Sequence, residues 1–328
     1  MKRFISILAG ICLFATACQQ PAARKHIYHI GISQLATNPG IDAIRTGFLA
    51  RMQQLGYKPG VNIQYDQQNA QGDNTVGQGI AKKFVSDSVD MVFAITTPTA
   101  ELCAGALRGT NIPMVFGAVT DPVAAKLVSS MDKPGGNITG TSDKWPVGAQ
   151  FDLLLKLKPG VKRIGVVYNP GETNSDANMK EVAAVCKAKG LTLVAVTVAG
   201  TGEVYGAAQS LIGRIDAFYV PADNTVITAM ASVVKVSEAN GIPLLPGVSS
   251  NVEQGGFGTL GPDYSDVGAE SAVLADKIIH GAKAGDLPVA TAQRFEYFFN
   301  LRSARATHIQ IPDSLLKKAA KVYGDSHH

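Results

Sequence analysis

A pattern of strands and helices occurs twice along this chain, in the same order each time. From Ile27 onward, short runs rich in β-branched and aromatic residues alternate with amphipathic stretches of helical periodicity, which is typical of βαβ units and parallel sheets. Gly31 and Gly56 frame one strand–helix unit and Gly165 and Gly190 frame another, and both pairs are 25 residues apart. Further along, DMVFAITTPTA…NIPMVFGAV is matched by DAFYVPADNTV…NGIPLLPGV. Two matches in the same order predict duplicated lobes.

We therefore predict an α/β protein of two Rossmann-like lobes with parallel sheets, joined by a hinge of crossovers. The first lobe is expected to comprise residues 27–143 plus 262–292, with the helix YSDVGAESAVLADKIIHG in its returning segment. The second lobe is expected to comprise residues 147–258 plus 294–328. The length of 328 residues accommodates two domains of ordinary size.

Composition and charge exclude several classes of protein. Apolar residues make up 46% and charged residues 17% of the chain, which is typical of globular and not of disordered proteins. No apolar run reaches the roughly 18 residues that a membrane-spanning helix needs. Four cysteines are too few for a disulfide scaffold, and Cys103 and Cys186 are expected in the core. The formal charge of +4 falls to +2 without residues 1–17 (28 basic against 26 acidic residues), so nucleic acid is not an expected partner.

The first residues have the order of an export signal. A basic start (KR) is followed by an apolar stretch (FISILAGICLF) and by the small residues ATA before Cys18, which is typical of a secretory signal over residues 1–17. Small residues directly before a cysteine resemble a lipobox, so we expect Cys18 to be diacylated; the alternative is an ordinary signal cleaved near Ala17. Residues 18–26 would form a flexible linker. The protein is expected to be periplasmic or at the cell surface, and to meet the membrane through this lipid anchor only.

Polar loops follow six of the predicted strands. In open parallel sheets, functional loops lie beyond the carboxyl ends of the strands, and two facing lobes bring such loops to one cleft, where small molecules tend to bind. Each loop taken alone also fits an ordinary turn rich in turn-forming residues. The six loops, rich in Thr, Ser, Asn, Asp and Pro, are residues 33–40, 96–100, 119–122, 168–175, 221–226 and 248–256.

The residue types in these loops suit binding better than catalysis. Catalysis needs an acid, a base or a nucleophile with a matched partner, but the histidines lie outside the loops. The sequence has no G-x-S-x-G elbow, no Walker-type loop and no metal-ligand spacing of His and Cys. GISQLATNPG also lacks the glycine spacing of a dinucleotide-binding loop. We therefore expect no enzymatic activity, no cofactor and no metal site.

The same loops suggest the chemistry of a ligand. Thr97 and Thr99 open one predicted helix, and Asn174 and Ser175 open another in the second lobe. Helix N-termini attract a carboxylate or a phosphate, and the Asp223 carboxylate is expected to meet an ammonium group. Together these groups fit a zwitterion such as an amino acid. The alternative, which is compatible with the first, is that these residues cap helices.

Nearly the whole mature chain carries motifs that occur together in one family. The most specific pair is DPVAAKLV followed by PGGNITG, and others are IGISQ, FAITTPTA, KRIGVVYNPGETNS and FNLRSARATHIQIP. In these segments the chain resembles the lipoprotein-type substrate-binding components of ABC transporters related to the streptococcal tryptophan-binding protein. The resemblance implies a periplasmic-binding-protein type I fold, an amino-acid-like ligand that includes aromatic amino acids, and a membrane permease and an ATPase as partners. A monomer is expected.

The resemblance also implies which residues line the ligand pocket. Carried over position by position, the pocket is expected to draw on Ser33, Gln34, Thr97, Thr99, Thr120, Asp121, Asn169, Asn174, Ser175, Asp223 and Asn224. Trp145, the only tryptophan, stands where the chain is expected to pass first between the lobes. It either packs at the hinge, which we favour, or stacks on a ligand ring.

Two classes of function fit this description. The first is the extracytoplasmic solute-binding component of an ABC importer, which captures an amino acid or a similar small solute in the cleft and delivers it to a permease. Closure would be a hinge motion that ligand contacts with both lobes stabilise. The second class is a ligand-sensing receptor on the same fold, or an exported α/β enzyme with an acid or base in the cleft. We favour the importer component.

Overall fold

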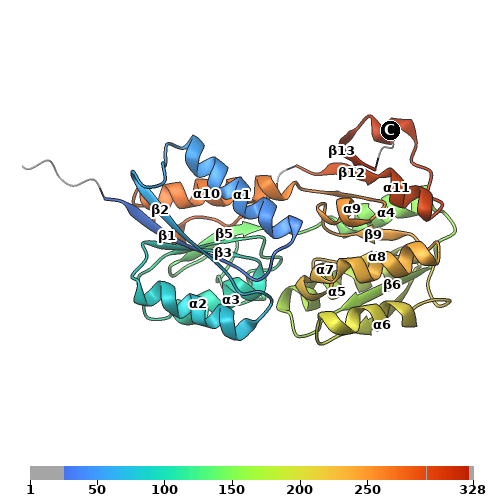
Figure 1. The fold of residues 1–328 in the computed structure, drawn as a ribbon, viewed down its shortest axis with the longest axis horizontal. Coiled ribbons are helices and arrows are strands. Elements are labelled where there is room, and N and C mark those ends of the chain that lie inside the picture. The colour runs from blue at the N-terminus through green and yellow to red at the C-terminus, as the bar shows by residue number, and fades with distance from the viewer. Residues whose placement is uncertain (1–25, 293, 325–328) are drawn as a thin grey trace, which may run out of the picture.

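The structure, a computed structural model, describes residues 26–292 and 294–324. The predicted signal (1–17) and Cys18 lie outside the described residues, as does the predicted linker apart from its last residue. The described chain forms two α/β lobes that lie side by side (Figure 1). None of the described helices is both long and apolar enough to cross a membrane.

Lobe 1 is built on a six-stranded sheet in which every pair of neighbouring strands is parallel. In spatial order the strands are β11 (Ala290–Thr291), β5 (Ile138–Ser142), β4 (Met114–Gly117), β3 (Met91–Ile95), β1 (Tyr28–Gln34) and β2 (Ile63–Asn69). The four main helices are α1 (Pro39–Gln54), α2 (Asn74–Ser86), α3 (Thr97–Leu107) and α10 (Tyr264–Ile279). A short 3₁₀ turn at Ala284–Asp286 follows α10.

Helices cover both faces of this sheet, which explains the continuous apolar sequence of its central strands. Helices α1 and α10 lie on one face and α2 and α3 on the other (Figure 1). Strand β3, with the sequence MVFAI, is buried along its whole length, as expected for a parallel strand between two helical layers. Cys103 of α3 is 1% exposed, which confirms its predicted place in the core.

Lobe 2 repeats this architecture with a four-stranded parallel sheet. In spatial order its strands are β7 (Thr192–Thr197), β6 (Arg163–Tyr168), β8 (Ala217–Val220) and β9 (Leu244–Pro246). Helices α4 (Val147–Leu157) and α5 (Thr173–Ala188) pack on one face, where Cys186 is buried as predicted. The other face is covered by α6 (Val204–Ser210), α7 (Asn224–Thr228) and α8 (Met230–Ala239), with a 3₁₀ turn at Thr201–Glu203 before α6.

Lobe 2 also contains a second sheet, which was not part of the prediction. Its strands are β10 (Gly258–Gly261), β12 (Glu296–Asn300) and β13 (Ala319–Tyr323), and β10 pairs with β12 in antiparallel fashion. The reason is topological: β10 leads out of lobe 2 towards α10, whereas β12 returns from β11 to lobe 2. Strand β10 also extends past the expected boundary at residue 258. Three short helices complete the lobe, namely α9 (Asn251–Gln254), α11 (Leu301–Ala306) and α12 (Asp313–Leu316).

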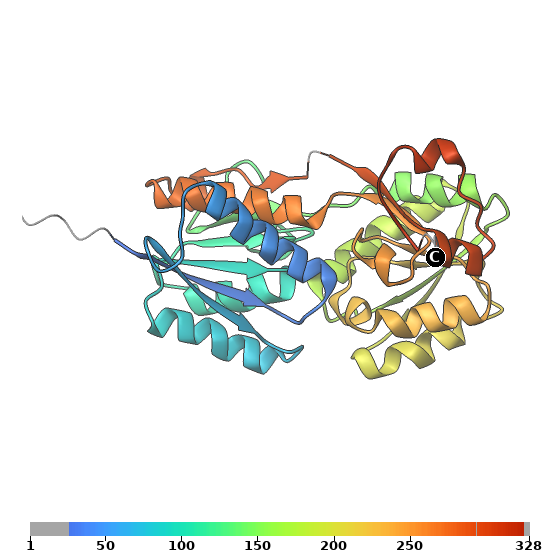
Figure 2. The ribbon, with the colours of Figure 1, turned by 45° about the horizontal axis from the view of Figure 1, so that its top comes forward.

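The described chain passes between the lobes three times. The passages lie between β5 and α4, between β10 and α10, and between β11 and β12. Figure 2 shows these segments running from one lobe to the other beside α10. Lobe 1 therefore consists of an N-terminal stretch and a returning stretch that contains α10 and β11, and the passages form the hinge.

The returning helix α10 lies very close to α1. A methyl group at Gly268 of α10 would collide with the carbonyl group of Ile44, and one at Gly47 of α1 would collide with the carbonyl group of Ser265. The backbones of the two helices are therefore in direct contact through these glycines. This contact fixes the start of α10 beside the start of α1, and both helix starts face lobe 2.

Candidate functional site

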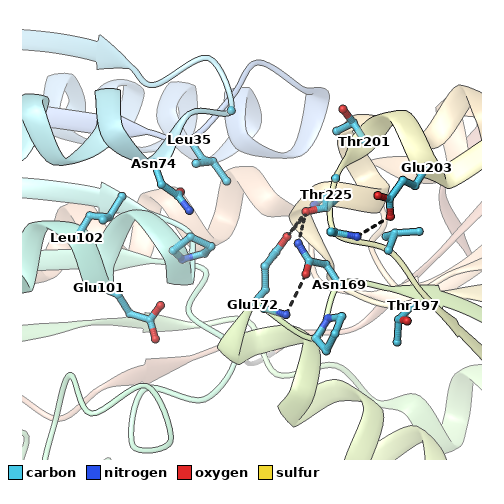
Figure 3. A pocket seen from close by; sticks show the side chains of 17 residues that line it. Leu35, Asn74, Glu101, Leu102, Asn169, Glu172, Thr197, Thr201, Glu203 and Thr225 are labelled. Carbon is cyan, nitrogen blue, oxygen red and sulfur yellow. Dashed lines mark hydrogen bonds between the residues drawn. The ribbon is translucent and has the colours of Figure 1, made fainter.

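Two regions between the lobes are lined by five of the eleven predicted site residues. The outer region is an open cleft of about 950 Å³. In Figure 3 its labelled side chains from lobe 1 (Leu35, Asn74, Glu101 and Leu102) face those from lobe 2, including Glu172, Glu203 and Thr225, across the gap. The inner region is a narrow chamber of about 20 Å³ where the two lobes meet.

The chamber is lined by the first residues of six helices and by the loops that follow four strands. The starts of α1, α3 and α10 come from lobe 1, and those of α5, α7 and α9 come from lobe 2. This is the edge at which parallel α/β sheets carry their ligand sites. The lining residues are Asn38, Gly40, Ile41, Thr96, Thr97, Ala118, Thr120, Asp143, Asn174, Ala222, Asn224, Ile227, Val248, Ser250 and Tyr264.

Polar atoms without a hydrogen-bond partner in the described structure converge on this chamber from both lobes. They are Oγ1 of Thr96 and Thr97 from lobe 1, and Oδ1 of Asn174 and Oγ of Ser250 from lobe 2. Thr97 is only 1% exposed and Asn174 only 3%. Because buried polar groups in native proteins nearly always have a partner, such a cluster marks a place where a polar ligand or ordered water completes the hydrogen bonds.

The backbone around the chamber favours an anionic group. Helices α1 and α3 both begin at the chamber, and the first N–H groups of a helix lack partners within the helix and carry partial positive charge. Among the described residues that line the chamber there is no Lys, Arg or His. Thr96 and Ala118 adopt positive φ angles of 76° and 57°, and such strained non-glycine residues cluster at binding sites.

Asp143 is the carboxylate in the chamber lining. It is 2% exposed, and its acceptor atoms are contacted by neutral donors. Thr120 Oγ1 donates to Oδ1 at 3.1 Å, whereas the Tyr264 hydroxyl and Trp145 Nε1 donate to Oδ2 at 2.5 Å and 3.3 Å. Burial raises the pKa of Asp143, and these three hydrogen bonds offset part of the rise.

Trp145 packs at the hinge, which is the alternative favoured from the sequence. Its ring is 5.3 Å from that of Tyr264, centroid to centroid, and it covers Gly261 so closely that a methyl group there would collide with the indole. Trp145 lies on the first passage between the lobes, whereas Gly261 and Tyr264 flank the second. The indole therefore holds two passages together and is not part of the chamber lining.

Asp223 does not have the position expected of an ammonium-binding residue. It is 0% exposed, and its carboxylate accepts hydrogen bonds from the N–H groups of Asn169 and Val226 and from the Ser175 hydroxyl, at 2.6, 2.8 and 2.5 Å. Burial raises the pKa of Asp223, and the negative charge of Glu172 raises it further. Asp223 thus caps α7 and ties three segments of lobe 2 together, which is the capping alternative.

Glu172 is an important residue that the sequence analysis missed. Its carboxylate accepts from the backbone N–H and the side-chain amide of Asn224 at 3.0 and 2.7 Å, and from the Asn174 amide at 3.2 Å. It also accepts from the N–H and the hydroxyl group of Thr225 at 2.8 and 2.7 Å. Glu172 therefore orients the two amides that lobe 2 presents to the chamber. The acidic residue directly before the predicted helix start was the available signal.

The other predicted residues are divided between the chamber and its surroundings. Thr97, Thr120, Asn174 and Asn224 line the chamber, and Asn169 lines the outer cleft. Asp121 lines a separate groove beside α5. The side chains of Gln34, Ser33 and Thr99 are buried within lobe 1 and line none of these three regions, and the same holds for Ser175 and Asp223 in lobe 2.

Most of the polar chamber residues that were missed come from the starts of helices α1, α9 and α10 and from the first passage between the lobes. Asn38 and Ser250 belong to loops that the sequence analysis had singled out, so their loops were predicted although the residues were not. Asp143 and Tyr264 lie at the hinge. Asp143 and Tyr264 reach the chamber because two segments that are distant in sequence meet at the hinge, and no local sequence motif predicts this meeting.

Residues 29–323 match the family model described as ABC transporter substrate binding protein. This chain belongs to that family. A tyrosine-binding protein of Clostridioides difficile is 39% identical over 282 residues, which cover 86% of this chain and 81% of that protein. The family and its structural neighbours are solute-binding proteins and not enzymes, and their fold is that of type I periplasmic binding proteins, as predicted.

Two solved structures of substrate-binding proteins differ in how well their lobes superpose on those of this chain. A Streptococcus pneumoniae protein in complex with L-Trp has 32% identity and a TM-score of 0.86, and the match covers 90% of this chain and 99% of the other. A ligand-free, open Clostridium difficile substrate-binding protein has 37% identity but a TM-score of 0.70, over 91% and 100%. Rotating one lobe lowers such a score without changing either lobe. The lobes of this substrate-binding protein are therefore arranged more like those of the L-Trp complex.

Proposed function

We propose that this substrate-binding protein captures a zwitterionic amino acid, with aromatic amino acids preferred, between its lobes and delivers it to an ABC permease driven by an ATPase. The observation that carries the proposal is the set of unpartnered polar atoms that lobe 1 and lobe 2 direct into one chamber. The name of the tyrosine-binding relative and the L-Trp complex of the structural neighbour support an aromatic ligand.

The chamber offers different chemistry to the two ends of such a ligand. The carboxylate would lie at the start of α3, which has no side-chain cap and where the hydroxyl groups of Thr96 and Thr97 add donors to the free N–H groups of the helix. The start of α1 lies beside it, but there Asn38 already accepts from the N–H of Ile41. The side chain would pack against Ile41, Ile227 and Val248 of the lining. An amino acid bridging these groups would contact both lobes, and its binding would stabilise closure.

The narrow chamber requires the lobes to part before a ligand enters. Its volume of about 20 Å³ is close to the space that one water molecule occupies by this measure. An amino acid would therefore enter an open form and bind as the lobes close around it. The three passages between the lobes provide the hinge for this motion.

We further propose that the protein is exported and anchored through lipidated Cys18. The proposal rests on the order of basic, apolar and small residues before Cys18 and on the extracytoplasmic role of this family. Replacing Cys18 with Ser should move the protein from the membrane fraction to the soluble fraction. Unchanged membrane association would contradict the anchor.

The ligand proposal is tested by calorimetry of the purified protein with L-tyrosine, L-tryptophan and a panel of other amino acids, sugars and organic anions. We expect an aromatic amino acid to bind most tightly. Mass spectrometry of small molecules that co-purify with the protein provides an independent identification. Tight binding of a sugar or an organic anion, together with no binding of any amino acid, would show that the proposal is wrong.

A pair of threonine variants tests whether the chamber is the binding site. The Thr97 hydroxyl has no partner in the described protein, so Thr97→Val should leave stability unchanged but weaken ligand binding. A neutral hydrogen bond is worth about 0.5–1.5 kcal/mol, so the loss of affinity should be roughly 2- to 13-fold. Thr99→Val is the matched control, because Thr99 is buried, unpartnered and on the same helix but lies outside the chamber lining. Equal effects of the two variants would place the ligand elsewhere.

A further inference from the structure

Asp143 combines three properties that the proposed function does not yet use. It lies in the chamber lining, it is almost completely buried, and it sits on the first passage between the lobes, directly after β5. A buried carboxylate is normally paired with a cation, because an uncompensated charge in the interior is costly. In this closed arrangement, all three of its side-chain hydrogen-bond donors are neutral.

The groups that face Asp143 leave its charge uncompensated. Among the described residues that line the chamber, Tyr264 is the only other titratable side chain, and lobe 2 contributes neutral residues there, such as Asn174 and Asn224. Lys144, the next residue in the chain, is exposed and faces the groove beside α5. The carboxylate of Glu172 lies behind the two asparagines and adds a further negative charge. A cation that neutralises Asp143 must therefore come from outside the protein.

We propose that Asp143 recognises the ammonium group of the ligand, and that this ion pair makes closure of the lobes depend on the ligand. The inference rests on the proposed function and specifies its substrate class, a primary amine that also carries a carboxylate. The two requirements are met by separate groups, since the start of α3 suits an anion and Asp143 suits a cation. Asp223 cannot take this role because all its bonds lie within lobe 2.

The hydrogen bonds of Asp143 connect this recognition to the hinge. Tyr264 begins α10 directly after the second passage, and Trp145 lies on the first, so one carboxylate oxygen joins the two passages. Tyr264 and Trp145 are positioning residues in this scheme. Closing an empty cleft would cover Asp143 with lobe 2 and bury its charge without a counter-ion, whereas closing around an ammonium group buries a neutralised pair.

The raised pKa of Asp143 is consistent with this arrangement, because burial between the lobes disfavours the charged form. Asp143→Asn should therefore have two effects in opposite directions. It should weaken binding of an amine ligand, because the ion pair is lost, and it should make closure without ligand easier, because no charge is buried. A residue with a purely structural role would not produce this combination.

The first test compares L-tyrosine with 3-(4-hydroxyphenyl)propionate, which lacks only the ammonium group, by calorimetry. The wild-type protein should bind L-tyrosine about ten- to a hundredfold more tightly, the range expected for a hydrogen bond to a charged group. Asp143→Asn should lose this preference, whereas Asp132→Asn, which removes an exposed carboxylate, should keep it. Equal weakening of both ligands by Asp143→Asn, or an unchanged preference, would overturn the proposal. If the variant does not fold, the preference of the wild-type protein decides alone.

The second test measures closure without any ligand, by small-angle X-ray scattering of the wild-type protein and Asp143→Asn. The variant should have the smaller radius of gyration; an equal or larger radius would overturn the link between recognition and closure. If no amino acid of the panel binds, the proposed function is wrong, and a titration with tyramine, which keeps the ammonium group and lacks the carboxylate, tests Asp143 separately. Binding of tyramine that Asp143→Asn abolishes would support the inference, and no binding of tyramine would overturn it.

Discussion

The Asp223 carboxylate holds lobe 2 together through bonds to Asn169, Ser175 and Val226. An asparagine at this position keeps one acceptor oxygen, and its NH₂ group would face a donor. We therefore expect Asp223→Asn to destabilise the fold by about 1–3 kcal/mol, the usual penalty for a buried donor without an acceptor. Ligand affinity should stay nearly unchanged, because Asp223 is not part of the chamber lining.

The pH dependence of this effect has a definite sign. Burial raises the pKa of Asp223 in the folded protein, so its contribution to stability is complete at acid pH and is lost as the pH rises through the folded-state pKa. The wild-type protein should therefore exceed Asp223→Asn in stability by a larger margin at acid than at neutral pH. Thermal unfolding of both proteins at two pH values, with calorimetry of ligand binding, tests this. A large loss of affinity with unchanged stability would contradict it.

At the residue scale, sequence reasoning identified the correct loops more reliably than the correct side chains. Thr97, Asn174 and Asn224 were predicted as ligand contacts and line the chamber, whereas Asp223, next to Asn224, is directed into lobe 2. The difference arises at the first turn of a helix, where consecutive side chains point in different directions. A helix start can be read from the sequence, but the side of it that faces another lobe depends on packing between distant segments.

The contact between α1 and α10 depends on glycines that bring two helix backbones together. In Gly268→Ala the new methyl group would collide with the carbonyl group of Ile44 and force the helices apart. Overpacking of this kind typically costs about 1–3 kcal/mol, which exceeds the gain of about 0.5–1 kcal/mol that alanine brings inside a helix. We expect a net loss of stability, measured by denaturant unfolding.

Gly79→Ala is the control for this experiment. Gly79 lies inside α2 and has open space where a methyl group would be placed, so the substitution should stabilise the protein by about 0.5–1 kcal/mol. A stabilising effect of both substitutions would show that α1 and α10 can move apart without penalty. Moving these helices would also shift Gly40 and Tyr264, which lie together at the chamber.

At the element scale, the periodicity of the chain predicts strands and helices well because each parallel strand is covered on both faces. The continuous apolar run of β3 is the direct result. The antiparallel pairing of β10 with β12 was not predicted, because these strands are neighbours only by virtue of the passages between the lobes. The residues of β10 and β12 do not indicate which strand pairs with them, or whether the pairing is parallel or antiparallel.

Two carboxylates approach each other across the outer cleft when the lobes are closed. Burial raises the pKa of Glu101 of α3, and the negative charge of Glu172 on lobe 2 adds to the rise, while a hydrogen bond from Thr173 of lobe 2 partly offsets it. Both interactions with lobe 2 require closure. The hydrogen bond from Thr173 is the larger of the two, so together they favour the charged form of Glu101. Their contribution to closure is therefore lost as the pH falls through the pKa of Glu101.

We expect Glu101→Gln to bind ligand more weakly than the wild-type protein at neutral pH, because a neutral amide is a poorer acceptor for the Thr173 hydroxyl, and equally well in acid. An interaction of a partly exposed charge is worth about 0.2–1 kcal/mol, so the loss should be roughly 1.4- to 5-fold. Calorimetry with L-tyrosine at two pH values measures it, and Glu270→Gln, which removes an exposed carboxylate of α10, should behave as wild type. Tighter binding of Glu101→Gln at neutral pH would show that repulsion by Glu172 outweighs the hydrogen bond from Thr173.

At the scale of the whole molecule, duplication in the sequence predicted two similar lobes, and the family resemblance predicted how they are used. The depth of the chamber and the role of the hinge could not be predicted from the sequence alone. Both depend on how far the lobes have closed, as the contact of Tyr264 with Asp143 and Trp145 illustrates. Residues from two distant segments meet there.

The passages between the lobes also set the order in which the molecule can be completed as it emerges from a ribosome or an export channel. Helix α10 and strand β11 emerge after all four strands of the parallel sheet of lobe 2. Until then, the apolar face of α1 with Ile44 and Phe48 lacks its cover, and β5 remains an open edge. Chains usually complete their N-terminal domain first. Here lobe 1 begins first but is completed only after β11 has emerged, and lobe 2 is completed last by β12 and β13. The N-terminal half therefore waits longest for its partners, and a chaperone that binds the emerging chain would be needed longest there.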